Sequence, residues 1–508
     1  MWRFLLQQLP KSSPDVVRHR RIWGAATCLG LLLAARTLAA PATLDEGRTP
    51  IVAGSADRVT LRACNIEGLR RPTRCGSILA AENPDETRGR RLSISIVVVS
   101  ASSGHALHDP ILVLMGGPGE DAISNTTLYA TQFSALLSDR DLLLIDQRGT
   151  GRSAPLNCSL YSRDDLATSL RQLFPPERVR QCEERLKAQA DLTQYTYAQF
   201  ARDLERIRLS LGYESFNLFA GSYGTRAAQV FMRAFPRSVR TAYLGSVVPI
   251  DIAIPLTFAK TADAAVNGTF EACGADPACQ ATFPNLHAEF ARILGDLGAA
   301  KISVSIPGVQ EPIALDRGRV VEWFRSMLYR PKTAAEVPYA IHRAYEGDWQ
   351  PIVDGILASA RGLDTALSLG LFFSVTCSED LASVSDEDID RASRGTFLGD
   401  YRVRQQLSAC QSWPKAPIKK GYRSAIHSSV PTMFVSGDID GASPLWFTRH
   451  VADGFSDRVE ILHPGRGHTE WSECVSRLYE RFVRSGATLP LRSASCDRVP
   501  RPPFKTSP

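Results

Sequence analysis

The chain has 508 residues, of which 44% are hydrophobic, so it is long enough to bury a large core in two or three domains and is not disordered. Its formal charge of +6 comes from 59 basic and 53 acidic side chains, and no long block of one sign interrupts the sequence. This balance argues against nucleic acid as a partner.

The first forty residues have the layout of a secretory signal. A basic stretch that ends at Arg21 is followed by an apolar run over residues 22–35 and then by small residues. The run is shorter than the about 20 residues of a membrane-spanning helix, which favours a cleaved signal over a membrane anchor. We expect a signal peptide over residues 1–40, cleavage after Ala40 or Ala42, and export to the periplasm or the extracellular space. Two adjacent arginines leave twin-arginine export open as the route, and no stable membrane span is expected after removal of the signal.

Removal of the signal also removes Cys28 and leaves ten of the 11 cysteines, an even number that is typical of disulfides in an exported chain. Sequence alone does not fix the connectivity. Pairing neighbours along the chain would close short loops, and we take as a hypothesis the pairs Cys64–Cys75, Cys158–Cys182, Cys273–Cys279, Cys377–Cys410 and Cys474–Cys496. A zinc site is disfavoured, because no second close cysteine pair or nearby histidine completes a ligand set around Cys273 and Cys279.

From residue 92 onward, short apolar runs alternate with helical patterns. The early runs cover residues 92–100, 110–115, 141–146, 216–220 and 241–245. The run at 141–146 has almost no polar face, which is typical of a parallel strand covered on both sides. Residues 196–211 carry apolar side chains at helical spacing, as a crossover helix requires. The alternation predicts a mostly parallel sheet whose first part covers residues 41–248.

A glycine-rich loop, Gly-Gly-Pro-Gly at residues 116–119, follows the second of these runs. Such a loop can direct backbone N–H groups at the negative charge that develops on a substrate oxygen. A phosphate-binding loop would need a lysine followed by serine or threonine, which this segment lacks. The sequence therefore predicts Gly116 and Gly117 as oxyanion-hole residues.

A second loop with two glycines, residues 146–153, ends the next apolar run. Its glycines permit sharp turns, and we expect its role to be structural. For Arg148 and Arg152, buried ion pairs and solvent exposure both remain open.

The segment around Ser222 has the pattern of a nucleophile elbow. Residues 215–225 read Ser-Phe-Asn-Leu-Phe-Ala-Gly-Ser-Tyr-Gly-Thr, so a strand runs into Ser222 and a helix begins after Gly224. The turn needs small residues two positions before and two after the serine, and Ala220 departs there from the usual glycine. We expect Ser222 to be the nucleophile and the Tyr223 amide to be the second oxyanion donor. The alternative is a strand-to-helix turn that only happens to contain a serine.

After residue 248 the pattern becomes mostly helical. Strand-like runs return at residues 431–436 and 459–462, and each is followed by a helical segment. We therefore expect a helical cap or lid inserted over residues 249–425, with the second part of the core over residues 426–508.

A serine hydroxyl needs an imidazole base that is itself oriented by a carboxylate. Where the serine sits on a strand-to-helix elbow, the acid and then the histidine follow it along the chain. The loop after the first late strand offers Asp438 and Asp440, and we favour Asp440 because it lies further into the loop. The loop after the second late strand offers His463 and His468. We favour His468, which is flanked by glycine and precedes a helix, and expect His463 to be packed or on the surface.

Together these motifs resemble the proline iminopeptidase and tripeptidyl aminopeptidase group of α/β-hydrolases. That group has a Gly-Gly-Pro-Gly loop, an Asp-Gln-Arg-Gly-x-Gly-x-Ser segment, a Gly-x-Ser-Tyr-Gly-Thr elbow and a Gly-x-x-Asp-x-x-Thr-Pro acid loop, and this chain carries them in the same order. The departures are Ala220, Ser443 in place of threonine, and Met115, where relatives often have histidine. The resemblance covers about residues 60–490. It is nearer to the exported tripeptidyl aminopeptidase branch, because that branch has a segment like Val-Thr-Cys-Ser-Glu-Asp at residues 375–380.

The resemblance implies an α/β-hydrolase fold with a mostly parallel central sheet and an inserted helical cap. It also implies that the enzyme cleaves short peptides from a free N-terminus and holds the substrate ammonium with carboxylates, for which Glu379 and Asp380 are the candidates. The alternative is that these two acids form a solvated turn.

We therefore expect an exported serine aminopeptidase that acts on peptides through an acyl-enzyme and requires neither a metal nor an organic cofactor. An esterase or other acyl hydrolase with the same triad is the alternative. A third interpretation, from a different class, is a binding protein that keeps the fold without catalysis.

Overall fold

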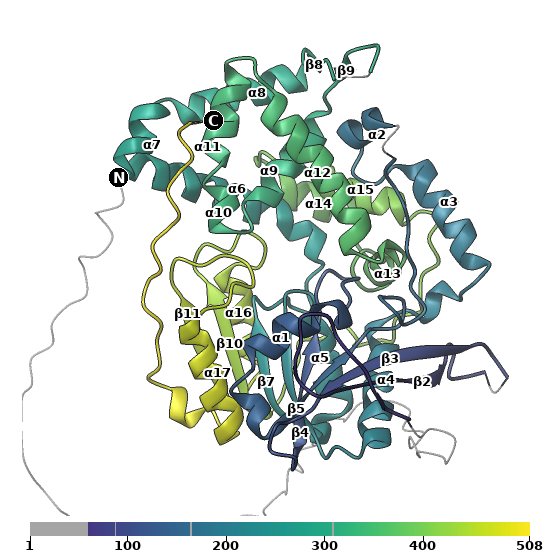
Figure 1. Ribbon diagram of the computed structural model, residues 1–508. Coiled ribbons are helices and arrows are strands. Elements are labelled where there is room, and N and C mark those ends of the chain that lie inside the picture. The colour runs from purple at the N-terminus through teal and green to yellow at the C-terminus, as the bar shows by residue number, and fades with distance from the viewer. Residues whose placement is uncertain (1–58, 87, 163–164, 307–308, 508) are drawn as a thin grey trace, which may run out of the picture. The chain divides into compact units, whose positions relative to one another are not determined.

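A large β-sheet forms the centre of the computed structural model, which describes residues 59–86, 88–162, 165–306 and 309–507 (Figure 1). The expected signal peptide over residues 1–40, with Cys28 and the cleavage positions Ala40 and Ala42, lies outside the described residues. Within the described chain the sheet has nine strands in the order β1-β2-β3-β5-β4-β6-β7-β10-β11. These are β1 (Arg62–Ala63), β2 (Thr73–Ala81), β3 (Arg91–Val99), β4 (Leu107–Leu114), β5 (Arg140–Ile145), β6 (Phe216–Gly221), β7 (Val239–Gly245), β10 (Thr432–Gly437) and β11 (Arg458–His463).

The sheet is parallel from β5 through β4, β6, β7 and β10 to β11, whereas β1, β2, β3 and β5 pair antiparallel. The mostly parallel sheet predicted from the apolar runs is therefore confirmed, and each predicted run coincides with a strand to within a few residues. Strands β1 and β2 were not predicted. In β2 only one face is buried, so exposed Leu79 stands between buried Ile78 and Ala80 and no continuous apolar run marks the strand.

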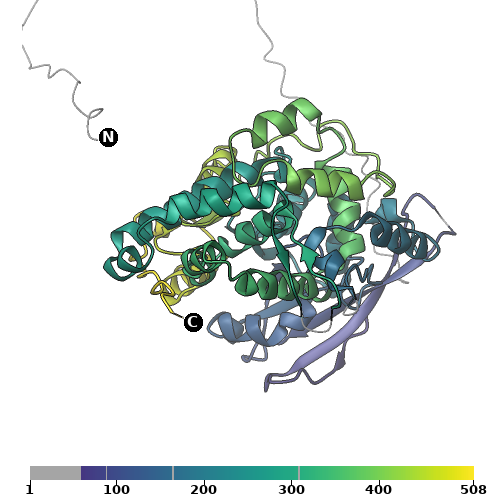
Figure 2. The same ribbon diagram turned by 90° about the horizontal axis from the view of Figure 1, so that it is seen from above.

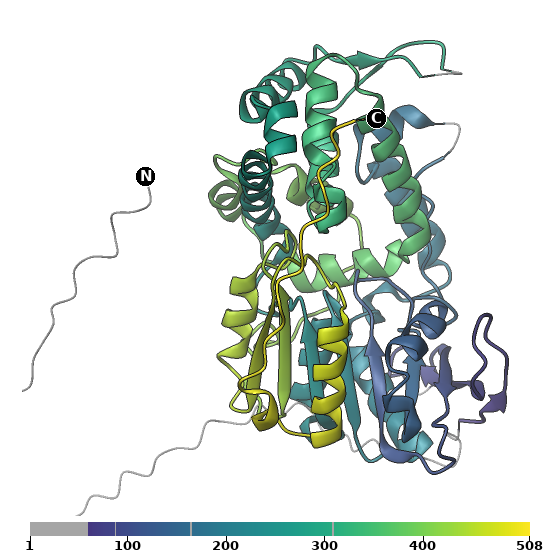
Figure 3. The same cartoon turned by 60° about the vertical axis from the view of Figure 1, so that its left-hand side comes forward.

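Helices cover both faces of the parallel part of the sheet (Figures 1 and 3). On one face, α1 (Thr126–Gln132) and α17 (Glu473–Ser485) share a core with β4 and β5. On the other face, α4 (Tyr197–Leu211), α5 (Gly224–Ala234) and α16 (Leu445–Ala452) pack into a second core. Short turns of 3-10 helix complete this part at η2 (Ile123–Asn125), η3 (Leu136–Ser138), η4 (Leu192–Gln194), η5 (Pro236–Ser238) and η7 (Leu489–Leu491).

Between β7 and β10 the chain leaves the sheet and forms a helical insertion, residues 254–409, which lies beyond the carboxyl ends of the strands (Figures 1 and 3). Figure 2 looks down onto these helices. They have a core of their own around Phe290 and Phe324. The elements are α6 (Ile254–Ala275), α7 (Pro277–Thr282), α8 (Leu286–Gly298), β8 (Ser303–Val304), β9 (Ile313–Ala314), α9 (Arg317–Met327), α10 (Pro331–Ala334), α11 (Val337–Tyr345), α12 (Gln350–Ala366), α13 (Leu369–Val375), η6 (Thr376–Asp380), α14 (Asp386–Ser393) and α15 (Tyr401–Ala409).

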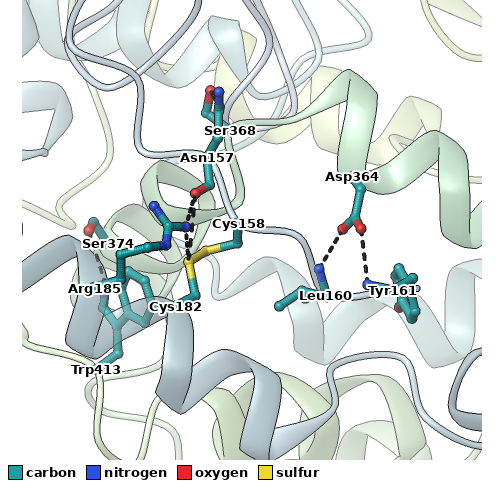
Figure 4. Close-up of a disulfide and its surroundings, with 10 residues drawn as sticks. All are labelled: Asn157, Cys158, Leu160, Tyr161, Cys182, Arg185, Asp364, Ser368, Ser374 and Trp413. Carbon is teal, nitrogen blue, oxygen red and sulfur yellow. Dashed lines mark hydrogen bonds between the residues drawn. A yellow bond between two sulfur atoms is a disulfide. The ribbon is translucent and has the colours of Figure 1, made fainter. Parts of the chain in front are cut away.

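The segment between β5 and α4 packs against this insertion. It contains α2 (Leu166–Arg171) and α3 (Pro176–Lys187), which the sequence analysis had not assigned. The Asp364 carboxylate of α12 accepts hydrogen bonds of 3.0 Å from the amides of Leu160 and Tyr161, as Figure 4 shows. The Ser368 hydroxyl donates to Asn157 Oδ1 over 2.8 Å, next to the Cys158–Cys182 disulfide (Figure 4). Residues that precede Ser222 in the sequence therefore stabilise helices that follow Ser222 in the sequence.

All five disulfides that chain order suggested are confirmed: Cys64–Cys75, Cys158–Cys182, Cys273–Cys279, Cys377–Cys410 and Cys474–Cys496. Disulfides form and persist in oxidising compartments, so they indicate a periplasmic or extracellular protein. Among the described residues, no single helix is long and apolar enough to cross a membrane. One pair, Gln350–Ala366 with Leu369–Asp380, has that length and composition only when taken together, with a bend of 82°.

Candidate active site

Ser222 occupies the tight turn between β6 and α5. Its φ of 53° lies in the left-handed region that side-chain-bearing residues seldom adopt, and such strain is common at functional positions. A Cβ atom at Gly224 would collide with the Leu114 carbonyl oxygen, so only glycine fits there. Ala220 is fully buried at the end of β6, in the core beneath the turn. The turn therefore accepts alanine before the serine but requires glycine after it.

His468 joins Ser222 to Asp440 in one hydrogen-bonded chain. The Nε2 atom of His468 lies 2.8 Å from Ser222 Oγ, and its Nδ1 atom lies 3.0 Å from Asp440 Oδ2. With the proton on Nδ1, the imidazole donates to the carboxylate and leaves Nε2 to accept the serine hydroxyl proton. The three residues follow β6, β10 and β11, so the carboxyl ends of these strands bring them together.

Backbone amides hold the Asp440 carboxylate in place, since Oδ1 accepts hydrogen bonds of 2.8 Å from both Ala442 and Ser443. The other acid of this loop, Asp438, accepts a 2.6 Å hydrogen bond from the Gly465 amide and pairs with Arg498 at 2.7 Å. Asp438 thus ties down the loop that carries the histidine, whereas Asp440 contacts the histidine itself.

The histidine loop is anchored on both sides. The His468 amide donates over 2.7 Å to the Tyr329 carbonyl oxygen, which belongs to the helical insertion, and the Thr469 amide donates over 2.9 Å to Ser246 Oγ. His463 is buried at the end of β11, and burial lowers its pKa, so it is a packed histidine. Tyr329 had no signal in the sequence, because its contribution is a backbone oxygen.

The glycine loop after β4 lies directly against the nucleophile. A Cβ atom at Gly116 would come within 3.2 Å of Ser222 Cβ. Gly117 has a φ of 104°, which disfavours any side chain there. In the described part of the chain, the amides of Gly117 and Tyr223 donate to no protein acceptor. Two free N–H groups beside the nucleophile are what an oxyanion requires, and the oxyanion role of Gly116, Gly117 and Tyr223 stays a prediction.

Glu379 and Asp380 lie on the π-helical turn η6. Together with the side chains that bind them, they form what we call the buried acid cluster. Their exposed fractions are 2% and 0%, so the alternative of a solvated turn is wrong. Glu379 accepts hydrogen bonds from the Tyr197 amide (2.9 Å) and the Tyr422 hydroxyl (2.7 Å). Asp380 accepts from the hydroxyl of Tyr223 and pairs with Arg226 Nη1 over 2.7 Å. The predicted contact of these two acids with a substrate ammonium stays a prediction.

Burial dominates the electrostatics of this cluster. It raises the pKa of Glu379 to about 7, although the Tyr422 hydroxyl and the Tyr197 amide lower it in part. Arg226 comes from α5, one turn after the nucleophile, and η6 follows α13 of the insertion. The pair between Arg226 and Asp380 therefore links the nucleophile helix to the helical insertion. The sequence could not assign Arg226, because 154 residues separate it from its partner.

The loop over residues 146–153 is held by an ion pair and by hydrogen bonds. Arg148 is buried and binds Asp203 with Nε and Nη2 over 2.7 and 2.8 Å. The Arg152 side chain is exposed, and its amide donates to Asp146 Oδ2 over 2.8 Å. Of the two arginines, Arg148 alone forms the buried ion pair that the sequence left open.

A cavity of about 660 Å³ opens on the acid side of the site, between α6, α16 and the Asp440 loop. Its walls include Leu256, Thr269, Leu328, Asp440 and Trp446, but not Ser222 or His468. It lies next to the acid of the triad. No cluster of three or more histidine, cysteine, aspartate or glutamate side chains suited to a metal ion occurs among the residues that the structure describes.

Two family models match the chain, and each extends a short way into the insertion. A model described as alpha/beta hydrolase fold matches residues 109–271, which include the glycine loop and Ser222. A model described as TAP-like protein matches residues 395–496, which include Asp440 and His468.

Three curated relatives are similar to the chain. The serine protease Hip1 of Mycobacterium tuberculosis is 23% identical over 526 residues, which cover 94% of this chain and 97% of that protein. The tripeptidyl aminopeptidase of Streptomyces coelicolor is 24% identical over 199 residues, or 35% of this chain and 36% of that protein. The proline iminopeptidase of Aeromonas sobria is 30% identical over 160 residues, or 30% of this chain and 33% of that protein.

Proposed function

We propose that this chain, a serine hydrolase that belongs to the α/β-hydrolase family of proline iminopeptidases and tripeptidyl aminopeptidases, releases residues or short peptides from the free N-terminus of peptides. The observation that carries the proposal is the hydrogen-bonded chain from Ser222 through His468 to Asp440. Acyl transfer needs a nucleophile, a base and an orienting acid in that order.

In the first half of the reaction, Ser222 Oγ attacks the carbonyl carbon of the scissile peptide bond while His468 Nε2 takes the hydroxyl proton. Asp440 stabilises the imidazolium that forms. The negative charge moves to the substrate oxygen, where the Gly117 and Tyr223 amides stabilise it, with Gly116 beside them. Each such donor contributes about 2.7–4 kcal/mol to the stability of the transition state.

In the second half, the carbon–nitrogen bond breaks and His468 returns the proton to the leaving amine, which gives an ester between Ser222 and the N-terminal fragment. A water molecule then attacks this ester, and His468 accepts one of its protons. Collapse of the second intermediate releases the fragment with a free carboxylate and returns the proton to Ser222 Oγ.

The helical insertion acts in this proposal as a cap that limits access to short peptides, with cap boundaries at residues 249–425. Two contacts support this role, since the insertion binds the loops on both sides of the nucleophile. The Tyr329 carbonyl oxygen accepts from the His468 amide over 2.7 Å, and the Ser368 amide donates to the Gly119 carbonyl oxygen over 2.9 Å.

Export through a signal peptide over residues 1–40 is part of the same proposal, and the five disulfides support it. Edman sequencing of the mature protein should start at residue 41 or 43. A mature protein that retains Met1 would contradict cleavage.

The function is tested by digestion of a peptide library with the purified protein, followed by mass spectrometry of the products. We expect fragments cut from free N-termini, no cleavage of the same peptides after N-acetylation, and no products with Ser222→Ala. Cleavage of acetylated peptides at internal bonds would overturn N-terminal specificity. Turnover of aryl esters without any turnover of peptides would instead favour the esterase alternative.

A further inference from the structure

The residue that follows the glycine loop, Glu120, brings a carboxylate to the nucleophile. A Cβ atom at Gly116 would lie 3.2 Å from Ser222 Cβ and 3.6 Å from Glu120 Oε2. The nucleophile and the carboxylate therefore flank the same glycine. The Glu120 amide also donates to the Gly116 carbonyl oxygen over 3.4 Å, which folds this residue back toward the site.

Glu120 differs from Glu379 and Asp380 in what its oxygens contact. Within the described residues, no side chain donates a hydrogen bond to its half-buried carboxylate and it forms no ion pair, whereas side chains bind both acids of the buried acid cluster. Burial raises the pKa of Glu120, and the Gly116 amide, His468 and Arg330 lower it in part, while Asp121 raises it further. A half-buried carboxylate that forms no ion pair is well suited to bind a cation that a ligand supplies.

We infer that Glu120 binds the α-ammonium group of the substrate and thereby determines how many residues are released. This inference rests on the proposed N-terminal peptidase function and deepens it. It assigns ammonium binding to a carboxylate that lies beside the nucleophile, and it leaves Asp380 to position Tyr223 and Arg226.

The position of Glu120 limits the length of the fragment. An extended chain advances about 3.3–3.6 Å per residue, so the ammonium of a three-residue fragment lies about 7 Å further from the scissile carbonyl than that of a single residue. Glu120 Oε2 and Ser222 Cβ both lie within 3.6 Å of the position that a Cβ atom would take at Gly116, and this short separation suits a fragment of one or two residues better than one of three. The preferred products are therefore single residues or dipeptides.

The test compares alanine, dialanine and trialanine aryl amides, each with a free and an acetylated N-terminus, on the wild type and on Glu120→Gln. The glutamine keeps the size of the side chain and removes its charge. We expect kcat/KM for the free alanine and dialanine amides to fall about 10–100-fold in Glu120→Gln, mainly through KM, because a hydrogen bond to a charged group is lost. Turnover of a short aryl ester without an amino group should fall much less than turnover of the free amines.

Two further variants separate substrate binding from a structural effect. Glu120→Asp keeps the charge and should recover part of the preference for free amines. Asp121→Asn removes the neighbouring negative charge and should leave the ratio of free to acetylated substrate unchanged. Thermal unfolding of each variant shows that the fold is intact.

Equal losses on amine-containing substrates and on the ester in Glu120→Gln would overturn the assignment, because they would indicate damage to the reaction itself. Fastest turnover of the trialanine amide, unaffected by Glu120→Gln, would overturn the length limit. A wild type that hydrolyses only the ester would overturn the proposed function and this inference together, whereas normal peptide turnover by Glu120→Gln would overturn the inference alone.

Discussion

Two groups of charged residues meet near the same serine, and they differ in what they leave accessible. In the hydrogen-bonded triad of Ser222, His468 and Asp440, the His468 side chain keeps an exposed fraction of 11%, and Ser222 is half-buried. In the buried acid cluster, the side chains of Arg226 and Asp380 are 1% and 0% exposed, and their charges face each other. An acidic residue therefore serves the reaction where the side chain that it binds stays accessible to the substrate, and serves the fold where that side chain is itself fully buried.

Tyr223 belongs to both groups. Its amide lies beside the nucleophile, and its hydroxyl binds Asp380 of η6. The buried acid cluster thus holds the residue that is proposed to stabilise the oxyanion. If the two groups have separate roles, changes in the first should alter the rate with little effect on stability, and changes in the second should do the reverse.

The largest effect is expected at the acid of the triad. Asp440→Asn should lower kcat about 10⁴-fold, because an amide no longer fixes the His468 tautomer or stabilises the imidazolium. Steady-state kinetics with an aryl amide substrate measures this loss. Asp438→Asn is the matched control and should keep most of the activity, since Asp438 contacts Gly465 and Arg498 instead of His468. Similar losses in both variants would remove the distinction between the two acids.

The next largest effect is expected in the buried acid cluster. Asp380→Asn leaves the buried Arg226 guanidinium without a counter-charge, and the free energy of unfolding should fall by about 3–5 kcal/mol. Urea unfolding followed by fluorescence measures it. Glu473→Gln breaks the exposed pair between Arg477 and Glu473 and should change the stability very little. A stable Asp380→Asn protein that still hydrolyses a short aryl ester but has lost turnover of free-amine peptides would place Asp380 at the substrate and remove the difference between the two groups.

The disulfide next to η6 should contribute a somewhat smaller amount. Cys377 and Cys410 are 33 residues apart, so replacing both with alanine should lower the free energy of unfolding by about 3–4 kcal/mol. Removing the Cys273–Cys279 bridge, with a separation of 6 residues, should cost less. Urea unfolding of the two double variants gives the order, and an inverted order would show that loop closure does not govern these contributions.

The last of these effects concerns pH. The pKa of Glu379 is about 7 in the folded protein and about 4.3 in an unfolded chain, so the folded state binds this proton more tightly. The resulting stabilisation is complete below pH about 4 and is lost as the pH rises through about 7, and it amounts to about 3–4 kcal/mol.

Glu379→Gln cannot titrate, so the difference in unfolding free energy between wild type and variant should change from pH 4 to pH 8 in favour of the variant. Urea unfolding across this range measures the difference. A constant difference would mean that Glu379 is already charged in the fold.

The sequence predicted the parts of the site that directly follow strands. Apolar runs located the strands, and chain order then placed Ser222, Asp440 and His468 at the ends of three of them. Chain order also predicted the five disulfides, because each pair closes a loop of at most 33 residues.

The remaining features depend on tertiary contacts that no local pattern marks. Glu379 binds the Tyr197 amide across 182 residues, so its burial could not be predicted from its neighbours. Glu120 could have been predicted as a candidate site residue, because this charged residue directly follows the glycine loop. The sequence analysis interpreted that segment through its glycines alone.

Labelling with a fluorophosphonate followed by peptide mapping shows which residue of this protein is the nucleophile of acyl transfer. We expect one adduct per chain, located on Ser222, that forms much more slowly in His468→Ala and is absent from Ser222→Ala. An adduct on a different serine, or a folded wild-type protein that takes up no label, would mean that Ser222 is not the nucleophile.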